Sequence, residues 1–142
     1  MAENIQENLL PETVEILKEK AIGAQNHAFA PHSGFQVGAA VLAGSGKIFT
    51  GCNIENDSFS LTVCAERCAI FKAVSEGERA IKAIAIAIPA NKSVNTVPCG
   101  ACRQVLAQFG DNITLIIVSH SETEIVKLSD LFPRPFRLTA SE

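Results

Sequence analysis

The sequence predicts a three-layer α/β domain, in which helices cover both faces of a mixed sheet. Segments of helical periodicity alternate with short apolar segments, in the order helix, hairpin, helix, strand, helix, strand. Residues 83–88 alternate alanine and isoleucine strictly, which suits a strand packed on both sides with its alanine face close to a helix. A length of 142 residues fits one domain, which we expect to span residues 1–142.

The first element is expected to be a helix over residues 11–27. Pro11 suits a first helical turn, because proline lacks the N–H group that would be unpaired there. Apolar side chains at helical spacing form a stripe for packing: Val14, Ile16, Leu17, Ala21 and Ile22. Residues 30–34 contain a proline and a glycine and are expected to form a loop.

A β-hairpin and a second helix are expected next. Residues 35–42 and 47–53 are predicted to be strands, since the glycines within residues 44–46 mark a turn between them. The helix is expected to begin at residue 62 or 63. It should end at Gly77, because glycine is the residue type favoured just after a helix.

The C-terminal half is expected to alternate strands and helices. Pro89 ends the strand of alternating alanine and isoleucine, and the apolar run of the last strand suits complete burial. The expected elements are a strand at 81–88, a loop at 90–98, a helix at 99–109, a strand at 113–118 and a short helix at 128–131.

Composition and charge exclude several classes of protein. A net charge of −3 argues against binding nucleic acid through its phosphates. The longest apolar runs, residues 83–88 and 115–118, fall far short of the roughly 20 residues that cross a bilayer. Residues 1–7 are polar and acidic, unlike a signal peptide. We therefore expect a cytoplasmic protein with no nucleic-acid partner and no membrane association.

Five cysteines in a reducing compartment point to metal binding or catalysis. Cys99 and Cys102 lie three residues apart at the start of a predicted helix, which places both sulfurs on one face. Cys64 stands at the start of another helix. Two helix N-termini can therefore direct three thiolates to one point. Zinc accepts this ligand set, and three protein ligands leave its fourth position open for water.

Glu66 is the candidate proton carrier. It follows Cys64 by two residues, so it is not an obvious fourth ligand but can stand beside the metal-bound water. Zinc nucleobase deaminases have this layout, with three ligands, a glutamate that does not bind zinc, and Pro-Cys-x-x-Cys downstream. In this chain the first ligand would be Cys64 instead of a histidine.

Other interpretations of the cysteines stay open at this point. The Cys99–Cys102 pair alone could be a redox pair of the thioredoxin type. Cys68, one turn after Cys64, could close a structural four-cysteine zinc site. Otherwise Cys52 and Cys68 are expected to be simple buried cysteines. The three histidines are expected to be solvent-facing or structural: His27, His32 and His120.

Four motifs occur in a characteristic order. They are Phe35-Gln36-Val37-Gly38-Ala39, Gly51-Cys52-Asn53-Ile54-Glu55-Asn56, Cys64-Ala65-Glu66-Arg67 and Pro98-Cys99-Gly100-Ala101-Cys102-Arg103-Gln104. With them the chain resembles the small zinc-dependent cytidine deaminases of pyrimidine salvage, over residues 29–109. The resemblance implies a cytidine deaminase-like α/β/α fold with a mixed five-stranded sheet and one zinc ion per chain. It also implies a homotetramer whose active sites are completed by neighbouring subunits.

The resemblance further implies a reaction and a role for each motif residue. Cytidine and 2′-deoxycytidine would be hydrolysed to the uridine products and ammonia. A related deaminase of aminopyrimidines or nucleoside antibiotics is the alternative enzyme. The roles are zinc binding by Cys64, Cys99 and Cys102, proton transfer by Glu66, stacking on the base by Phe35, base recognition by the Ala65 backbone, and binding of a ribose hydroxyl by Asn53 and Glu55.

Two more features of the pattern carry expectations. Three thiolates leave the zinc site with a net charge of −1, which Arg67 and the helix N-termini can offset, so we expect Arg67 to hydrogen-bond the sulfurs. Asn53 and Glu55 lie two apart at a strand end, so their side chains should face one way. Phe59 stands where the family often has a tyrosine at a subunit boundary, and Phe136 is expected to cap a neighbour's site.

Overall fold

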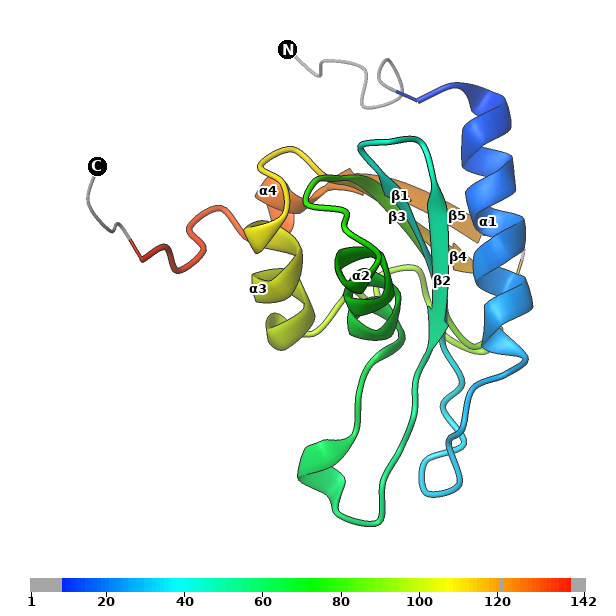
Figure 1. Cartoon of the computed structure of the whole chain (residues 1–142). Helices are drawn as coiled ribbons and strands as arrows, with labels where there is room; N and C mark the ends of the chain where they lie inside the picture. Colours follow the sequence, from blue (N-terminus) through cyan, green and yellow to red (C-terminus); the bar gives the residue numbers. More distant parts are fainter. Residues whose placement is uncertain (1–8, 121, 139–142) are drawn as a thin grey trace.

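The computed structural model describes residues 9–120 and 122–138, which form helices and strands. In chain order they are α1 (Pro11–Gln25), β1 (Gly38–Ala43), β2 (Ile48–Cys52), a 3-10 turn (Phe59–Leu61), α2 (Ala65–Ser75), β3 (Ile81–Ala87), α3 (Gly100–Gln108), β4 (Thr114–Ser119), β5 (Glu122–Lys127) and α4 (Leu128–Leu131). The strands form one sheet in the order β2-β1-β3-β4-β5 (Figure 1). The pair β3–β4 is parallel and the other neighbours are antiparallel.

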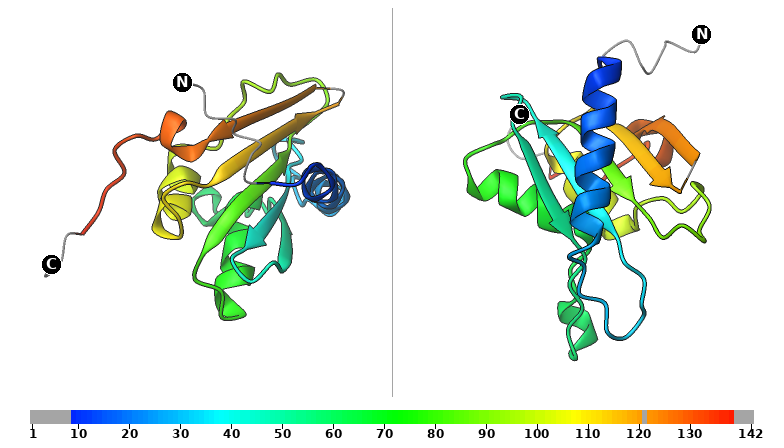
Figure 2. Two further views of the ribbon diagram at one scale, coloured as in Figure 1. Left: turned by 90° about the horizontal axis from the view of Figure 1, so that it is seen from above. Right: turned by 90° about the vertical axis from the view of Figure 1, so that its right-hand side faces the viewer.

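The alternation in β3 separates the two faces of the sheet. Its alanines pack in one core with Leu17 and Ala21 of α1. Its isoleucines pack in the other core with Ile70 of α2 and Leu106 of α3. Small alanine side chains let a helix lie close to the sheet, and Figure 2 shows α1 on one face with α2 and α3 on the other. The predicted three-layer α/β architecture is confirmed.

Several boundaries differ from the expected ones. β1 begins at Gly38 instead of residue 35. α2 begins at Ala65 instead of residue 62 or 63, because the backbone of Val63 pairs with Ile54 in an isolated bridge and is not available to the helix. Gly77 follows α2 in the left-handed region, with φ of +103°, as expected for glycine at a helix end.

The residue pattern predicts no strand at β5, although the family resemblance implies a fifth strand. β5 lies at the edge of the sheet, with β4 as its single neighbour. Its first two residues are exposed and the rest are half-buried, so it lacks the apolar pattern of a central strand. The opening residues 1–7 lie outside the described residues. Among residues 9–120 and 122–138, no helix has the length and apolar character needed to cross a membrane.

A close approach of β2 to α2 positions the helix that carries Glu66. A Cβ atom at Gly51 would lie 2.5 Å from the backbone N of Ala69 and 2.8 Å from the carbonyl O of Ala65. We therefore expect Gly51→Ala to lower the free energy of unfolding by about 1–3 kcal/mol, measured by urea denaturation. Gly23→Ala, within α1, is the control, because a Cβ atom there would meet no atom within 4 Å beyond its chain neighbours and its own helix backbone, so this change should not lower stability. An unchanged stability of Gly51→Ala would contradict this tight packing.

Candidate active site

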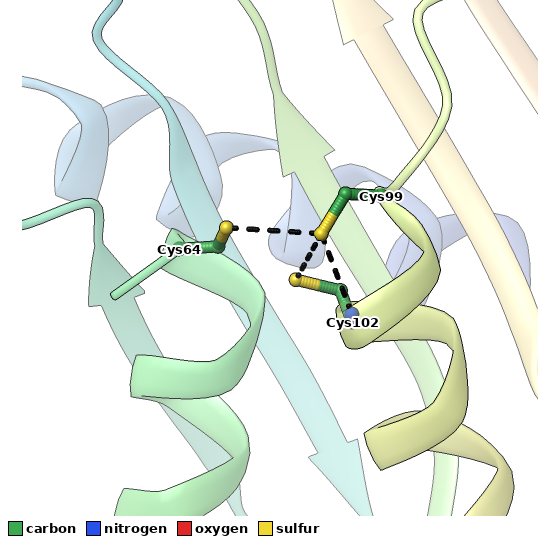
Figure 3. Close-up of side chains that lie close together, drawn as sticks. All are labelled: Cys64, Cys99 and Cys102. Carbon is green, nitrogen blue, oxygen red and sulfur yellow. Dashed lines mark hydrogen bonds between the residues drawn. The ribbon is translucent and has the colours of Figure 1, made fainter. Parts of the chain in front are cut away.

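Two helix N-termini bring three cysteines together (Figure 3). Cys64 is the N-cap of α2, Cys99 is the N-cap of α3, and Cys102 lies in the first turn of α3. The Sγ atom of Cys99 lies 3.9 Å from that of Cys64 and 3.5 Å from that of Cys102. All three sulfurs lie within 4.8 Å of one another. The predicted convergence of three thiols from two helices is confirmed.

The spacing of the sulfurs fits a zinc ion. In a tetrahedral site with zinc–sulfur bonds of about 2.3 Å, two sulfurs lie roughly 3.8 Å apart. The two sulfur–sulfur distances from Cys99, 3.5 and 3.9 Å, lie on either side of this value. Three thiolates also leave one position for water, as catalytic zinc sites require. The donor set is therefore that of a catalytic rather than a closed zinc site.

The surroundings of Cys64 favour its thiolate form, whereas the hydrogen bond with Cys64, followed by burial, raises the pKa of Cys102. Nη2 of Arg67 donates to Sγ of Cys64 at 3.4 Å, and the backbone N–H of Cys102 donates to Sγ of Cys99 at 3.5 Å. The hydrogen bond with the Cys102 thiol, followed by the one from Arg67, lowers the pKa of Cys64 to about 5 against the effect of burial. A thiolate is the form that binds metal.

Glu66 lies buried beside the sulfurs. It belongs to the first turn of α2, is 6% exposed, and lines a cavity together with Cys64 and Cys99. Burial raises the pKa of its carboxyl group, because the ionised form loses its hydration. The carboxyl group can therefore hold a proton closer to neutral pH, as a general acid–base catalyst needs to do.

The cavity combines apolar walls with a few polar groups, as small-molecule sites usually do. Phe35, Asn53 and Ala65, for which the sequence predicts contact with a substrate, line this cavity. Asn53 fixes one wall: its Nδ2 donates to the carbonyl of Phe35 at 2.6 Å, and its Oδ1 accepts from the N–H of Val37 at 2.9 Å. Other lining residues, to which the sequence assigns no role, are Val37, Thr62, Ile86, Ile88, Thr96, Val97 and Pro98.

Some of these additional lining residues have a signal in the sequence. Residues 96–98 directly precede Cys99, so the chain must bring them to the cluster. Ile86 and Ile88 lie on the isoleucine face of β3 and its extension, which covers the same side of the sheet as α2 and α3. Thr62 has no such signal, because it lies in the irregular segment between the 3-10 turn and α2.

Glu55 is placed apart from Asn53. It lines a neighbouring hollow, and Thr62 is common to this hollow and the main cavity. Asn53 and Glu55 nevertheless hydrogen-bond the same loop, residues 32–37. Glu55 contacts residues 32 and 33, whereas Asn53 contacts residues 35 and 37, so the two side chains reach different parts of that loop.

Phe59 and Phe136 both lie outside the main cavity, and each is 71% exposed. The ring of Phe59 packs edge-on against His32, with ring centroids 5.0 Å apart, and Nε2 of His32 lies 3.1 Å from Oδ1 of Asp57. The backbone of Phe136 is bound twice by the side chain of Gln104, at 3.0 and 3.2 Å. Both phenylalanine rings are therefore presented at the surface of the chain.

A closed four-cysteine site does not form among the described residues. Cys68 lies outside the cluster, whose sulfurs come from Cys64, Cys99 and Cys102. The expectation that Cys52 and Cys68 are buried is wrong, since both are half-buried. The reason is that Cys52 belongs to β2, an edge strand, where the sheet ends. A redox pair formed by Cys99 and Cys102 alone would leave the neighbouring Cys64 without a role.

Fold and site together define a zinc-binding deaminase, and comparison with known proteins supports this class. Residues 11–119 match the family model described as the cytidine and deoxycytidylate deaminase zinc-binding region. The chain is 45% identical over 120 residues to a cytidine deaminase of Sporosarcina psychrophila, covering 81% of this chain and 87% of that one. It is 49% identical over 100 residues to a probable cytidine deaminase of Dictyostelium discoideum, covering 70% and 67% of the two chains.

A solved structure agrees with these matches. The crystal structure of cytidine deaminase from Burkholderia pseudomallei superimposes with a TM-score of 0.80 at 38% identity, covering 86% of this chain and 98% of that one. The chain belongs to the cytidine deaminase family, whose members are zinc-dependent hydrolytic enzymes. The resemblance of the sequence motifs to this family is thereby confirmed.

Arg67 allows a direct test of how the charge of the sulfurs is balanced. We expect Arg67→Gln to weaken zinc binding roughly 10–100-fold, because it removes the charged donor to Cys64. Competition with a chelator measures this change. Arg79→Gln is the matched control, since Arg79 donates to the backbone carbonyls of Val74 and Glu78 and not, among the described residues, to a cysteine. Unchanged zinc retention and rate in Arg67→Gln would show that the sulfurs do not need this cation.

Proposed function

We propose that this protein hydrolyses cytidine and 2′-deoxycytidine to uridine and 2′-deoxyuridine, with release of ammonia, in pyrimidine salvage. The observation that carries the proposal is the buried carboxyl group of Glu66 in a cavity beside three sulfurs from two helix N-termini. The names of the related proteins support cytidine as the substrate.

In the proposed mechanism, one chain supplies all three protein ligands of its metal site. Cys64, Cys99 and Cys102 would hold one zinc ion per chain. When bound, zinc lowers the pKa of water and so supplies a nucleophile at neutral pH. Arg67 and the two helix N-termini offset the negative charge of the thiolates, so that the site is not left with an uncompensated charge.

Glu66 moves the protons. Its carboxylate accepts a proton from the attacking water and delivers it to N3 of the pyrimidine, while the oxygen adds to C4. A second proton then passes through Glu66 to the amino group, which leaves as ammonia while C4 becomes a carbonyl carbon. The reaction consumes one water molecule for each ammonia released. The raised pKa of Glu66 suits a group that must both accept and donate protons.

Residues of the cavity wall bind and orient the nucleoside. Phe35 packs against the base, and the backbone at Ala65 reads its polar edge. The side-chain amide of Asn53 donates one hydrogen bond to the loop and accepts one from it. Its second amide hydrogen and its second oxygen lone pair can bind a ribose hydroxyl. Glu55, whose hollow adjoins the main cavity at Thr62, accepts a hydrogen bond from the same sugar. A nucleobase without its sugar would leave these polar groups unpaired, which disfavours its binding.

We also propose a cytoplasmic homotetramer. Free thiols that hold a metal need a reducing compartment. Exposed apolar side chains in and near the 3-10 turn, with Phe59 at 71% and Leu61 at 64% exposure, suit contact with other subunits, as does Phe136. Figure 1 shows this turn projecting away from the sheet. Light scattering of the purified protein tests the assembly, and a monomer with full activity would contradict it.

The test of the activity is the change in ultraviolet absorbance of cytidine with zinc-loaded protein. We expect conversion to uridine with one ammonia per nucleoside, and the same with 2′-deoxycytidine. Turnover of another aminopyrimidine without turnover of cytidine would point to a related deaminase. Full zinc loading without turnover of any aminopyrimidine would overturn the proposal.

A further inference from the structure

The Glu55 carboxylate is held in place by the loop that precedes β1. It accepts hydrogen bonds from the backbone N–H groups of His32, at 2.8 Å, and Ser33, at 3.2 Å. The hydroxyl of Ser33 donates to its second oxygen. These contacts bridge 22 or 23 positions in the sequence, so they arise from the fold and not from local geometry.

The Ser33 hydroxyl has a second partner. While it donates to Glu55, it accepts a hydrogen bond from the N–H of Phe35 at 3.0 Å. Gly34, between the two residues, allows the chain to turn so that the N–H of Phe35 faces the Ser33 hydroxyl, because its φ of +67° is a conformation that glycine adopts without strain. One hydroxyl therefore connects two of the residues that the proposed mechanism uses to bind the nucleoside, one for the sugar and one for the base.

We propose that Ser33 is a positioning residue that directs the Glu55 carboxylate toward the sugar hydroxyl of the nucleoside. The inference rests on the proposed function and adds a residue to it. A free glutamate side chain loses rotational entropy when it is fixed on a ligand. Hydrogen bonds that hold the carboxylate before the nucleoside arrives reduce this loss at the binding step.

The charge state of Glu55 agrees with this role. The hydrogen bond from Ser33 is the main cause that lowers the pKa of Glu55 below its usual value. The side chain is therefore ionised, and so an acceptor, at neutral pH. Phe35 does not depend on Ser33 alone, because Nδ2 of Asn53 holds its carbonyl. Loss of the Ser33 hydroxyl should thus weaken binding of the sugar more than binding of the base.

The test compares two nucleosides in Ser33→Ala. For cytidine we expect KM to rise roughly tenfold with kcat within twofold of the wild type, the effect of one lost hydrogen bond to a charged group. For 2′,3′-dideoxycytidine, which keeps the 5′-hydroxyl but lacks the ring hydroxyls that Glu55 would bind, we expect the inhibition constant against cytidine to change less than about twofold. Ser33→Thr keeps the hydroxyl and should restore the KM for cytidine.

Ser45→Ala is a closely matched control. The hydroxyl of Ser45 donates to Glu78 and accepts from the N–H of Lys47, two residues on, as Ser33 does with Glu55 and Phe35. It lies in the β1–β2 turn, outside the cavity, and its removal should leave both constants unchanged. A melting curve of each variant reports any general loss of stability.

The outcomes separate this inference from the proposed function. Wild-type protein that fully binds zinc but does not convert cytidine would overturn the proposed function and this inference with it. Active wild-type protein whose Ser33→Ala variant binds cytidine normally would overturn the inference alone. A Ser33→Ala variant whose affinities for cytidine and 2′,3′-dideoxycytidine fall to the same extent would also overturn the inference, because Ser33 would then act on the loop as a whole.

Discussion

Glu66→Gln is expected to lower kcat for cytidine by about 10²–10⁴-fold while the protein keeps its zinc. Glutamine has nearly the shape of glutamate, so the 6%-exposed position stays filled. Its amide cannot accept the proton of the attacking water or deliver it to the base. The measurements are the steady-state rate and the zinc content of the same sample.

The control for this change is Glu76→Gln, at the exposed C-terminal end of the same helix. It should have the rate of the wild type. A Glu66→Gln protein with normal turnover would remove Glu66 from the proton transfers. A variant that loses zinc would instead show that Glu66 is needed for the metal site, and its low rate would carry no information on proton transfer.

Cys102→Ser is expected to bind little zinc and to have no measurable turnover. Cys102 is completely buried between the helices, and a serine hydroxyl fills nearly the same space without supplying a thiolate. Zinc also stabilises the folded state: at a free concentration 100 times its dissociation constant, it adds about 2.7 kcal/mol. The melting temperature of the variant should therefore stop responding to added zinc.

Cys68→Ser provides the matched control for the metal site. Cys68 lies on the same helix as Cys64 but outside the three-sulfur cluster. We expect full zinc content, full turnover and a zinc-dependent melting temperature. Loss of zinc in this variant would contradict the three-cysteine site and favour a closed site with four cysteines.

Much of the candidate site was predictable because its determinants are local. A spacing of three residues places Cys99 and Cys102 on one side of a helix start wherever that helix lies. The position of Glu66, in the first turn after Cys64, is fixed in the same way. Motifs of this kind also identify the family, since they preserve the local geometry that the chemistry needs.

Other parts could not be predicted, because they depend on partners distant in the sequence. β5 is a strand because β4 offers it a free edge, and its own residues have no marked strand pattern. The half-burial of Cys52 and Cys68 follows from the position of β2 at the other edge. The hollow that receives Glu55 depends on a loop more than 20 positions away.

Local sequence patterns establish the layers of this protein and the chemistry of its metal ligands. Alternation of alanine and isoleucine in β3 assigns one face to α1 and the other to α2 and α3, because side chains alternate across a strand. Contacts between groups distant in the sequence depend instead on how the whole chain folds. Cys64 reaches Cys99 across 35 positions because the order β2-β1-β3-β4 sets α2 beside α3 on one face. Local periodicity determines the direction in which a side chain points, whereas the distance between two elements follows from the pairing of the whole sheet.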